Sequence, residues 1–299
     1  MGPIRRAVVT GAAGFIGRHL TRALSDRGAD LVTVDIRGGQ GDRTVKADLA
    51  EPRVLDGHLT PDTVIFHLAA RANVAASVDD PTADFRHNVV ALFEVLESAR
   101  RARCRLVFAS SAAVYDPGTE PPLTENALAR PSSPYGASKL AGEAYCAAYH
   151  RSYALDIRVA RLFNAYGPGM RQFVIHDIVR KLERDSEELV LLGDGQQVRD
   201  YLYVEDTVRG LIAIAERGEG GEDYNLASGE PTVIIDLARR IAALMGRSGV
   251  RIRPTGQSWP GDIPRWYADT GKLKALGFAP EVGLEAGLAK TVNWLRGGA

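Results

Sequence analysis

The sequence lacks the features that mark secreted, membrane-spanning and metal-rich proteins. Its 299 residues include 2 cysteines, Cys104 and Cys146, which have neither metal-ligand spacing nor the pattern of a disulfide framework. No apolar run is long enough to span a membrane, and the run 7–10 is too short for the core of a signal peptide. We therefore expect a cytoplasmic protein without a membrane partner, a disulfide or a bound metal.

The sequence also lacks an excess of charge of either sign, internal repeats and low-complexity tracts. Lysine and arginine together number 37, as do aspartate and glutamate, so no overall field attracts nucleic acid. Hydrophobic residues make up 45% of the chain, which is enough for a large core. Any basic site must then be local, and nucleic acid is not an expected partner.

What is present is an alternation of short β-branched runs with longer amphipathic stretches, which is typical of βαβ units around a parallel sheet. The first half predicts strands at 7–10, 31–35, 64–68, 106–110 and 157–162, and helices at 15–27, 82–101 and 135–152. The second half predicts helices at 173–184, 205–216 and 234–245, and a strand at 189–192. We predict an α/β fold with a Rossmann-type doubly wound parallel sheet over 1–167, to which a segment near 196–227 returns. A smaller C-terminal α/β substrate lobe is expected over 168–299.

Three glycines follow the first predicted strand and open the first predicted helix. Gly11 suits a tight turn, Gly14 a close approach of the backbone to a pyrophosphate, and Gly17 close helix packing. Free N–H groups and the dipole at a helix N-terminus favour such an anion. Asp35 ends the next predicted strand, where a carboxylate binds the ribose 2′-hydroxyl and repels a 2′-phosphate. The pattern predicts a site for NAD rather than NADP.

Two neighbouring features bear on this cofactor site. Arg18 and Arg37 lie near enough in the sequence to bind a 2′-phosphate if the Asp35 side chain turned away. Asp48 and Leu49 follow a further short strand and are either adenine contacts or the solvated start of a helix. A glycine-rich turn without a ligand is the competing interpretation, and the position of Asp35 disfavours it.

Tyr135 and Lys139 are four residues apart in a predicted helix and therefore share one face. The spacing alone is weak evidence, but a buried strand ending in Ser111 precedes it, and ligands bind at the carboxyl edge of an open α/β sheet. A phenol with a pKa of about 10 is a poor base at neutral pH. A nearby ammonium lowers that pKa, so we expect Lys139 to activate Tyr135 and to bind the nicotinamide ribose. Ser111 either orients the substrate oxygen or only caps the strand end.

These residues resemble the extended short-chain dehydrogenase/reductase family, the NAD-dependent nucleotide-sugar epimerases and dehydratases, over nearly the whole chain. The glycine turn, the segment 67–70 and the segment 135–139 match motifs of that family. The resemblance implies NAD as the cofactor and a nucleotide-diphosphate sugar as the substrate. It implies further cofactor contacts at Phe15, Ile16, Leu68, Ala69, Ala70 and, as a supporting residue in the helix 82–101, Asn88.

The resemblance also implies contacts with the substrate. It places a diphosphate contact at Asn164, a nucleotide clamp at Arg199 and a ribose contact at Asp262. Trp266 stands where the bulk of the residue admits or rejects an N-acetyl group, and a tryptophan there favours a plain hexose. Trp259 stands where the family commonly has an arginine for the diphosphate, so that charge must be held differently in this chain.

Within the family the chain is most similar to the UDP-glucose 4-epimerases. The two positions after Ser111 matter most, because dehydratases carry Asp-Glu there and decarboxylases a Glu, whereas this chain has Ala112 and Ala113. The resemblance therefore implies reversible hydride transfer at sugar C4 through a 4-keto intermediate. The alternatives are a 4-ketoreductase of a deoxysugar pathway and a non-catalytic dinucleotide sensor. Relatives dimerise through the helices at 82–101 and 135–152, so a homodimer is expected.

Overall fold

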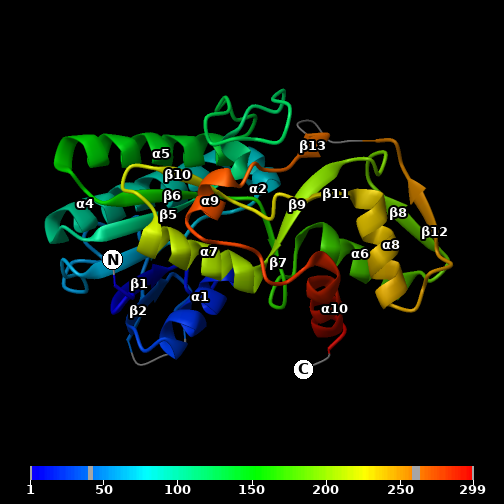
Figure 1. Cartoon of the computed structure of the whole chain (residues 1–299), viewed down its shortest axis with the longest axis horizontal. Coiled ribbons are helices and arrows are strands. Elements are labelled where there is room, and N and C mark those ends of the chain that lie inside the picture. Colours follow the sequence, from blue (N-terminus) through cyan, green and yellow to red (C-terminus); the bar gives the residue numbers. More distant parts are fainter. Residues whose placement is uncertain (1, 40–42, 258–262, 298–299) are drawn as a thin grey trace.

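The computed structural model describes residues 2–39, 43–257 and 263–297 of the chain. Within these ranges a large α/β body, on the left in Figure 1, adjoins a smaller lobe on the right. The strands are β1 (Arg6–Thr10), β2 (Asp30–Asp35), β3 (Thr44–Lys46), β4 (Thr63–His67), β5 (Arg105–Ser111), β6 (Ile157–Leu162), β7 (Asn164–Tyr166), β8 (Glu188–Leu191), β9 (Val198–Tyr203), β10 (Asp223–Leu226), β11 (Pro231–Val233), β12 (Arg251–Pro254) and β13 (Arg265–Trp266). The helices and helical turns are α1 (Phe15–Asp26), α2 (Val74–Asp79), α3 (Pro81–Phe85), the π-helical turn η1 (Arg86–Val90), α4 (Ala91–Ala102), the 3₁₀ turn η2 (Ala112–Val114), α5 (Pro134–Tyr153), α6 (Phe173–Arg184), α7 (Val204–Arg217), α8 (Ile234–Leu244), α9 (Gly271–Ala275) and α10 (Leu284–Leu295).

The large body is a parallel sheet covered by helices on both faces. Its strands lie in the order β10-β6-β5-β4-β1-β2-β3, which confirms the predicted Rossmann-type doubly wound fold. In β1, Ala7 and Val9 face the core beneath α1 and α7, whereas Val8 faces the core beneath α4 and α5 (Figure 1). A strand that is buried on both faces needs apolar residues on both, which explains the continuous apolar runs in the sequence.

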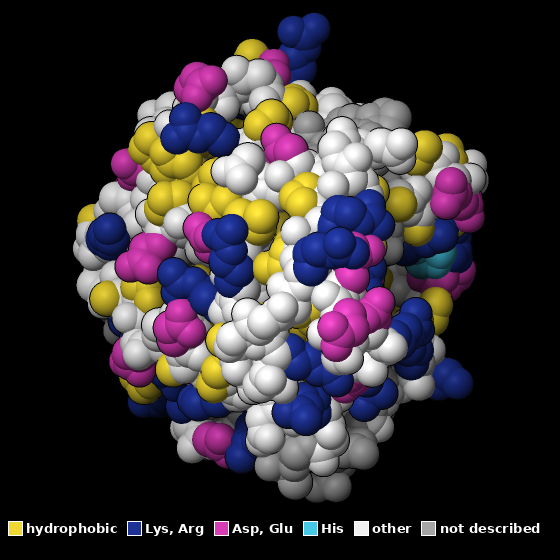
Figure 2. All heavy atoms as spheres, turned by 90° about the vertical axis from the view of Figure 1, so that its right-hand side faces the viewer, with side chains coloured by type: hydrophobic (Ala, Val, Ile, Leu, Met, Phe, Trp, Pro, Cys, Tyr) yellow, Lys and Arg dark blue, Asp and Glu magenta, His cyan; other side chains and the backbone are white. Residues whose placement is uncertain are grey.

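The smaller lobe contains two short sheets and the helices α6, α8 and α10. In the first sheet β9 pairs with β7, β11 and β13, and in the second β8 pairs with β12. The three helices share a core that includes Ile178, Leu237 and Leu288. On the end face of this lobe, Lys and Arg side chains lie among Asp and Glu (Figure 2), as in the ion pair of Arg251 with Glu188. This face therefore shows no patch of a single sign.

The chain passes back from the smaller lobe to the large body. β9 belongs to a sheet of the smaller lobe, but α7 packs on β5 and β6, and β10 pairs with β6 in the central sheet. The domain boundary after residue 167 stays a prediction. None of the helices in the described ranges combines the length and the apolarity needed to cross a bilayer. Both cysteines are buried and free.

The predicted elements of the first half match the observed ones to within one residue at each end, with one exception. The exception is inside the helix predicted over 82–101, which the structure shows as a continuous helical stretch in which the π-helical turn η1 joins α3 and α4. There the N–H of Ala91 bonds to the carbonyl of Arg86, five residues earlier. A π turn inserts one residue into the hydrogen-bond ladder. A hydrophobic period read over the whole stretch does not reveal that insertion.

Candidate active site

A cavity of about 1010 Å³ lies at the carboxyl edge of the central sheet and extends to the smaller lobe. The predicted site residues that line it are Gly11, Gly14, Phe15, Ile16, Gly17, Asp35, Asp48, Leu49, Leu68, Ala69, Ala70, Ser111, Tyr135, Lys139, Asn164, Arg199 and Trp266. Asn88 is buried beside the cavity. Asp262, the predicted ribose contact, and Trp259, which stands where the family commonly has an arginine, lie outside the described residues. Segments that are far apart in the sequence therefore meet at one site.

The glycine turn between β1 and α1 forms one wall of the cavity. Gly11 has a φ of +69°, and a Cβ there would lie 2.7 Å from the backbone nitrogen of Ala69. The N–H of Gly14 donates to the Gly11 carbonyl at 2.9 Å, and a Cβ at Gly17 would collide with that same oxygen. The residue before α1 is Gly14, so no side chain caps the N–H groups of the first turn of this helix. This cradle fits the pyrophosphate of a dinucleotide.

Asp35 is fixed beside this turn at the end of β2. Its Oδ2 accepts a hydrogen bond from the N–H of Ala13 at 3.0 Å, and its Oδ1 accepts one from the N–H of Arg37 at 2.9 Å. Arg37 lines the same cavity, whereas Arg18 lines a separate one. The held carboxylate fits a ribose hydroxyl better than a phosphate, in agreement with a site for NAD.

The first turn of α5 is anchored so that Tyr135 faces the cavity. Ser133 caps the helix by accepting a hydrogen bond from the N–H of Gly136 at 3.1 Å. The N–H of Tyr135 donates to the hydroxyl of Ser77 at 3.1 Å. A side chain at Gly136 would collide with the carbonyl oxygen of Ala113, so glycine lets α5 pack closely on η2. Sequence and packing together bring Tyr135 to the end of β5.

Tyr135, Ser111 and Lys139 lie together at this end of the cavity. The Tyr135 side chain is 9% exposed and is hydrogen-bonded to the Ser111 hydroxyl. Lys139 Nζ donates to the carbonyl oxygen of Ala109 at 2.8 Å and lies 6.0 Å from the centroid of the Tyr135 ring. A phenol, a hydroxyl and an ammonium therefore share one partly enclosed space.

Burial shifts the pKa of both titratable groups of this cluster. It raises the pKa of Tyr135 to about 12; the bond to Ser111 opposes the rise and the charge of Asp84 adds to it. Burial lowers the pKa of Lys139 to about 8, against the opposing charges of Asp84 and Glu143. The sequence led us to expect a lowered phenol pKa because of Lys139. The structure shows the opposite direction: desolvation raises the phenol pKa, since both forms of the phenol are removed from water but only the phenolate is charged.

Asn88 links α5 to α3 and to the segment at Arg71 through hydrogen bonds. Its Oδ1 accepts the N–H of Arg71 at 2.8 Å, and its Nδ2 donates to Asp84 at 2.9 Å and to Ser138 at 3.0 Å. The Ser138 hydroxyl in turn donates to the carbonyl oxygen of Tyr135 at 2.8 Å. Asn88 therefore bonds to the backbone and side chains around the cavity, and does not itself belong to its lining among the described residues.

The strands β7, β9 and β13 bring the predicted substrate residues together. Asn164 Nδ2 donates to the carbonyl oxygen of Asp200 at 2.9 Å. Arg199 Nη1 donates to the carbonyl oxygens of Ile263 at 2.7 Å and of Val198 at 2.9 Å. Trp266 pairs in register with Arg199 across β13 and β9. The three candidates, Asn164, Arg199 and Trp266, lie at the smaller-lobe side of the cavity.

Several aromatic side chains of this half were not predicted as site residues. They contribute a largely apolar wall, in which the rings of Tyr166 and Tyr201 meet edge to face at 6.0 Å. Those that line the cavity are Phe163, Tyr166, Phe173 and Tyr201. Tyr166 and Tyr201 lie in the short strands β7 and β9, whose residues look like ordinary core in the sequence. Their proximity to Asn164 and Arg199 in the sequence is the signal that could have identified them.

Comparison with known proteins identifies what this arrangement is similar to. Residues 7–227 match the model of the NAD dependent epimerase/dehydratase family. A UDP-glucose 4-epimerase of Mycolicibacterium smegmatis is 33% identical, over 97% of this chain and 98% of its own. A dTDP-glucose 4,6-dehydratase of Streptomyces griseus is 34% identical, over 96% and 93%. The solved structure of a UDP-N-acetylglucosamine 4-epimerase from Methanobrevibacter ruminantium M1, in complex with UDP-N-acetylmuramic acid, matches with a TM-score of 0.91 at 30% identity, over 100% of both chains.

Proposed function

The chain belongs to the NAD-dependent epimerase/dehydratase family, and from this premise we propose that it is a nucleotide-sugar 4-epimerase. One observation separates this proposal from the dehydratases of the family. Of the described residues that line the cavity, only Asp35 and Asp48 are carboxylic acids; Asp35 ends β2 and Asp48 follows β3, both on the side of the glycine turn. Elimination of water needs an acid beside the leaving hydroxyl. The positions next to Ser111 are Ala112 and Ala113, so the site is suited to oxidation and reduction alone.

The cofactor is NAD, which supplies the acceptor and afterwards the donor of the hydride at C4. The glycine turn would hold its pyrophosphate and Asp35 its adenosine ribose. Lys139 would bind the nicotinamide ribose, and Asp48 and Leu49 would contact the adenine. These assignments follow the positions of the residues along the cavity.

In the proposed reaction Tyr135 takes the proton from the sugar 4-hydroxyl and later returns it to the other epimer. Ser111 is bonded to Tyr135 and would orient the reacting oxygen. Since burial raises the pKa of Tyr135 to about 12, proton removal depends on the positive charge that Lys139 keeps beside it. The same pair serves both directions, as a reversible reaction requires.

Epimerisation requires that the 4-keto sugar turn over without leaving the cavity. Asn164 and Arg199 would hold the diphosphate and the nucleotide while the sugar turns, and Asp262 would bind the ribose. Tethering makes the return step effectively intramolecular, which accelerates it strongly. Trp266 lines the sugar side, and its bulk favours a plain hexose over an N-acetylated one.

A 4-ketoreductase would use the same three residues, Ser111, Tyr135 and Lys139. The absence of an acid next to Ser111 supports a ketoreductase and an epimerase equally. The two functions differ in how the cofactor is handled. An epimerase regenerates its cofactor in each cycle and is expected to be purified with NAD tightly bound. A ketoreductase consumes one NADH per turnover. A sensor without catalysis has no need of the Tyr135 and Lys139 pair.

We propose that the protein is a homodimer joined through α4 and α5. Phe93 on α4 and Tyr145 on α5 are 38% and 44% exposed, and their rings meet edge to face at 6.2 Å. Exposed aromatic clusters on adjacent helices are typical of association surfaces. A cytoplasmic location and the division of the chain after residue 167 also remain proposals.

The experiment that tests the proposed function is a screen of UDP-, dTDP-, GDP- and CDP-hexoses by NMR. Purified protein without added cofactor is expected to convert one of them to its C4 epimer. A requirement for added NADH, with a reduced product, would identify the ketoreductase instead. Binding of NAD with no conversion of any hexose would favour the sensor.

A further inference from the structure

Three consecutive residues at the end of β5 are each bonded to α5. Their partners are spaced four residues apart and therefore share one helix face. The pairs are Ala109 O with Lys139 Nζ at 2.8 Å, Ser110 Oγ with Glu143 Oε1 at 2.5 Å, and the Ser111 hydroxyl with Tyr135. The proposed reaction uses the first and third pairs. The second pair, between Ser110 and Glu143, has no role in it so far.

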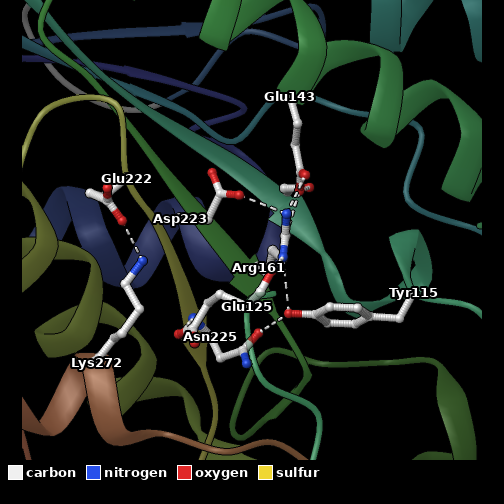
Figure 3. A network of polar contacts seen from close by, with 9 residues as sticks. Tyr115, Glu125, Glu143, Arg161, Glu222, Asp223, Asn225 and Lys272 are labelled. Carbon is white, nitrogen blue, oxygen red and sulfur yellow. Dashed lines mark hydrogen bonds and ion pairs between the residues drawn. The ribbon is translucent and has the colours of Figure 1, made fainter. Parts of the chain in front are cut away.

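Glu143 is a buried carboxylate, and Arg161 binds it with two hydrogen bonds. Arg161 Nε donates to Oε1 at 2.9 Å and Nη2 to Oε2 at 2.7 Å. The same guanidinium donates to the Tyr115 hydroxyl at 3.1 Å, to the Glu125 carbonyl oxygen at 2.7 Å and to Asp223 Oδ2 at 2.7 Å (Figure 3). A buried charge of this kind is costly unless it is fully bonded. The orientation of the Glu143 carboxylate is therefore fixed.

The network also reaches β10. The Tyr115 hydroxyl donates to Asn225 Oδ1 at 2.6 Å (Figure 3). Asn225 Nδ2 in turn donates to the carbonyl oxygen of Leu123 at 2.8 Å. Loops and strands from several parts of the chain thus converge on Arg161 and hold it against α5. Within this network Glu143 accepts a hydrogen bond from Ser110, a residue of the cavity wall.

We propose that Glu143 is a positioning residue, which holds the end of β5 against α5 through Ser110 and keeps a fixed negative charge one helical turn from Lys139. The proposal rests on the proposed function, because it adds a residue to the same site. Arg161 fixes Glu143, and Glu143 in turn acts on the two groups that handle the proton. Glu143 itself does not line the cavity among the described residues.

The charge of Glu143 has a definite effect on Lys139. The titratable groups that act on or around Lys139 are Asp84 of α3, Tyr135, Glu143 and Cys146 of α5, and His67 of β4. Burial lowers the pKa of Lys139 to about 8, and Asp84 and Glu143 oppose this. Without the charge of Glu143 the pKa of Lys139 falls further. Less ammonium then remains at neutral pH to favour ionisation of Tyr135.

The test compares Glu143→Gln with Asp223→Asn. Both carboxylates accept a hydrogen bond from the same Arg161 nitrogen at 2.7 Å, so each variant removes one negative charge from the same guanidinium. Asp223 is not among the groups that act on Lys139. The main measurement is the titration midpoint of Lys139, followed by NMR with ¹³C-labelled lysine in protein without added ligand. The Lys139→Met variant assigns the signal, and kcat and KM are measured in parallel.

Glu143→Gln is expected to lower the Lys139 midpoint by about one pH unit and kcat about tenfold, with KM nearly unchanged. Asp223→Asn is expected to leave the midpoint and kcat nearly as in the unmodified protein. An unmoved midpoint in Glu143→Gln, or equal shifts in the two variants, would overturn the proposal. If the unmodified protein converts no nucleotide sugar, the proposed function fails, but the titration still decides the role of Glu143.

A second variant covers the case in which Glu143→Gln does not fold. Ser110→Ala removes only the hydroxyl between β5 and Glu143 and leaves the ion pair with Arg161 intact. Ser110→Ala is expected to lower the Lys139 midpoint by less than Glu143→Gln does, because Arg161 alone then holds the Glu143 carboxylate. An unchanged midpoint in Ser110→Ala would contradict the proposal.

Discussion

The Lys139 ammonium lies 6.0 Å from the centroid of the Tyr135 ring, on the same face of α5. Both side chains are buried, at 3% and 9% exposed, so their interaction is only weakly screened by water. Burial alone moves both pKa values away from the charged forms, that of Tyr135 to about 12 and that of Lys139 to about 8. The site therefore depends on the placement of charges around this pair.

Tyr135→Phe is expected to abolish turnover and to leave NAD bound. The variant loses the group that moves the proton, and general acid–base catalysis of this kind contributes about 10²- to 10⁴-fold. The glycine turn and Asp35 are untouched, so the cofactor content after purification should match that of the unmodified protein. Activity within a few-fold of the unmodified protein would remove Tyr135 from the reaction.

Lys139→Met is expected to stabilise the protein at pH 7 while destroying activity. The pKa of Lys139 falls from 10.5 to about 8 on folding, so burial of the ammonium costs the unmodified protein roughly 3 kcal/mol. The variant avoids this cost but loses the hydrogen bond to the Ala109 carbonyl, which offsets part of its advantage. At pH 7 we expect the free energy of unfolding of Lys139→Met to exceed that of the unmodified protein by about 1 to 3 kcal/mol.

The gain in Lys139→Met should depend on pH in a defined direction. Below about pH 8 the lysine is charged in both states, and the native protein bears the full cost. Between about 8 and 10.5 the folded lysine loses its proton first, so the difference between the two proteins shrinks. Denaturant unfolding at several pH values measures this, and a difference that grows with pH would contradict it.

Gly17→Ala is expected to destabilise the fold by about 2 kcal/mol or more and to weaken NAD binding. Its Cβ would collide with the carbonyl oxygen of Gly11, which cannot move without displacing the turn. Gly283→Ala is the matched control, because a Cβ there meets nothing within 4 Å. Thermal unfolding and calorimetric titration with NAD compare the two variants. Equal changes in stability and in NAD affinity in the two variants would show that neither property depends on the close packing of α1 against the turn.

Phe93→Glu is expected to convert a dimer into a monomer. A charge at this exposed position of α4 would be buried without a partner in the proposed interface. Leu244→Glu on α8 is the control, because Leu244 and Phe93 are both 38% exposed. Light scattering after size-exclusion chromatography gives the mass of each variant. A monomeric unmodified protein, or a dimer in both variants, would refute this interface.

The glycine turn could be predicted from the sequence because its requirements are local. Gly11, Gly14 and Gly17 lie within one turn and one helix start, and Asp35 follows from the length of a single βαβ unit. The central strands were predictable for a similar reason, since a strand buried on both faces needs a continuous apolar run. Tyr135 and Lys139 needed only a helical period of four residues and the preceding strand.

The remaining parts of the site depend on pairings that no local pattern encodes. Short strands such as β7, β9 and β13 become strands only by pairing with each other, and they carry Tyr201 and its neighbours to the cavity. Arg161 lies in a predicted strand, but no local pattern shows that it is buried against Glu143 and Asp223, which come from other segments. The π-helical turn around Asn88 likewise makes a contact with α5, through Ser138, that its own sequence does not reveal.

The central claim is that one site removes a hydride from sugar C4 and returns it to the same carbon. Its most direct test uses the nucleotide hexose found in the screen, labelled with ²H at C4, and purified protein without added cofactor. The account predicts formation of the C4 epimer with the ²H retained at C4. Loss of the ²H from the product, or conversion only when NADH is supplied, would contradict it.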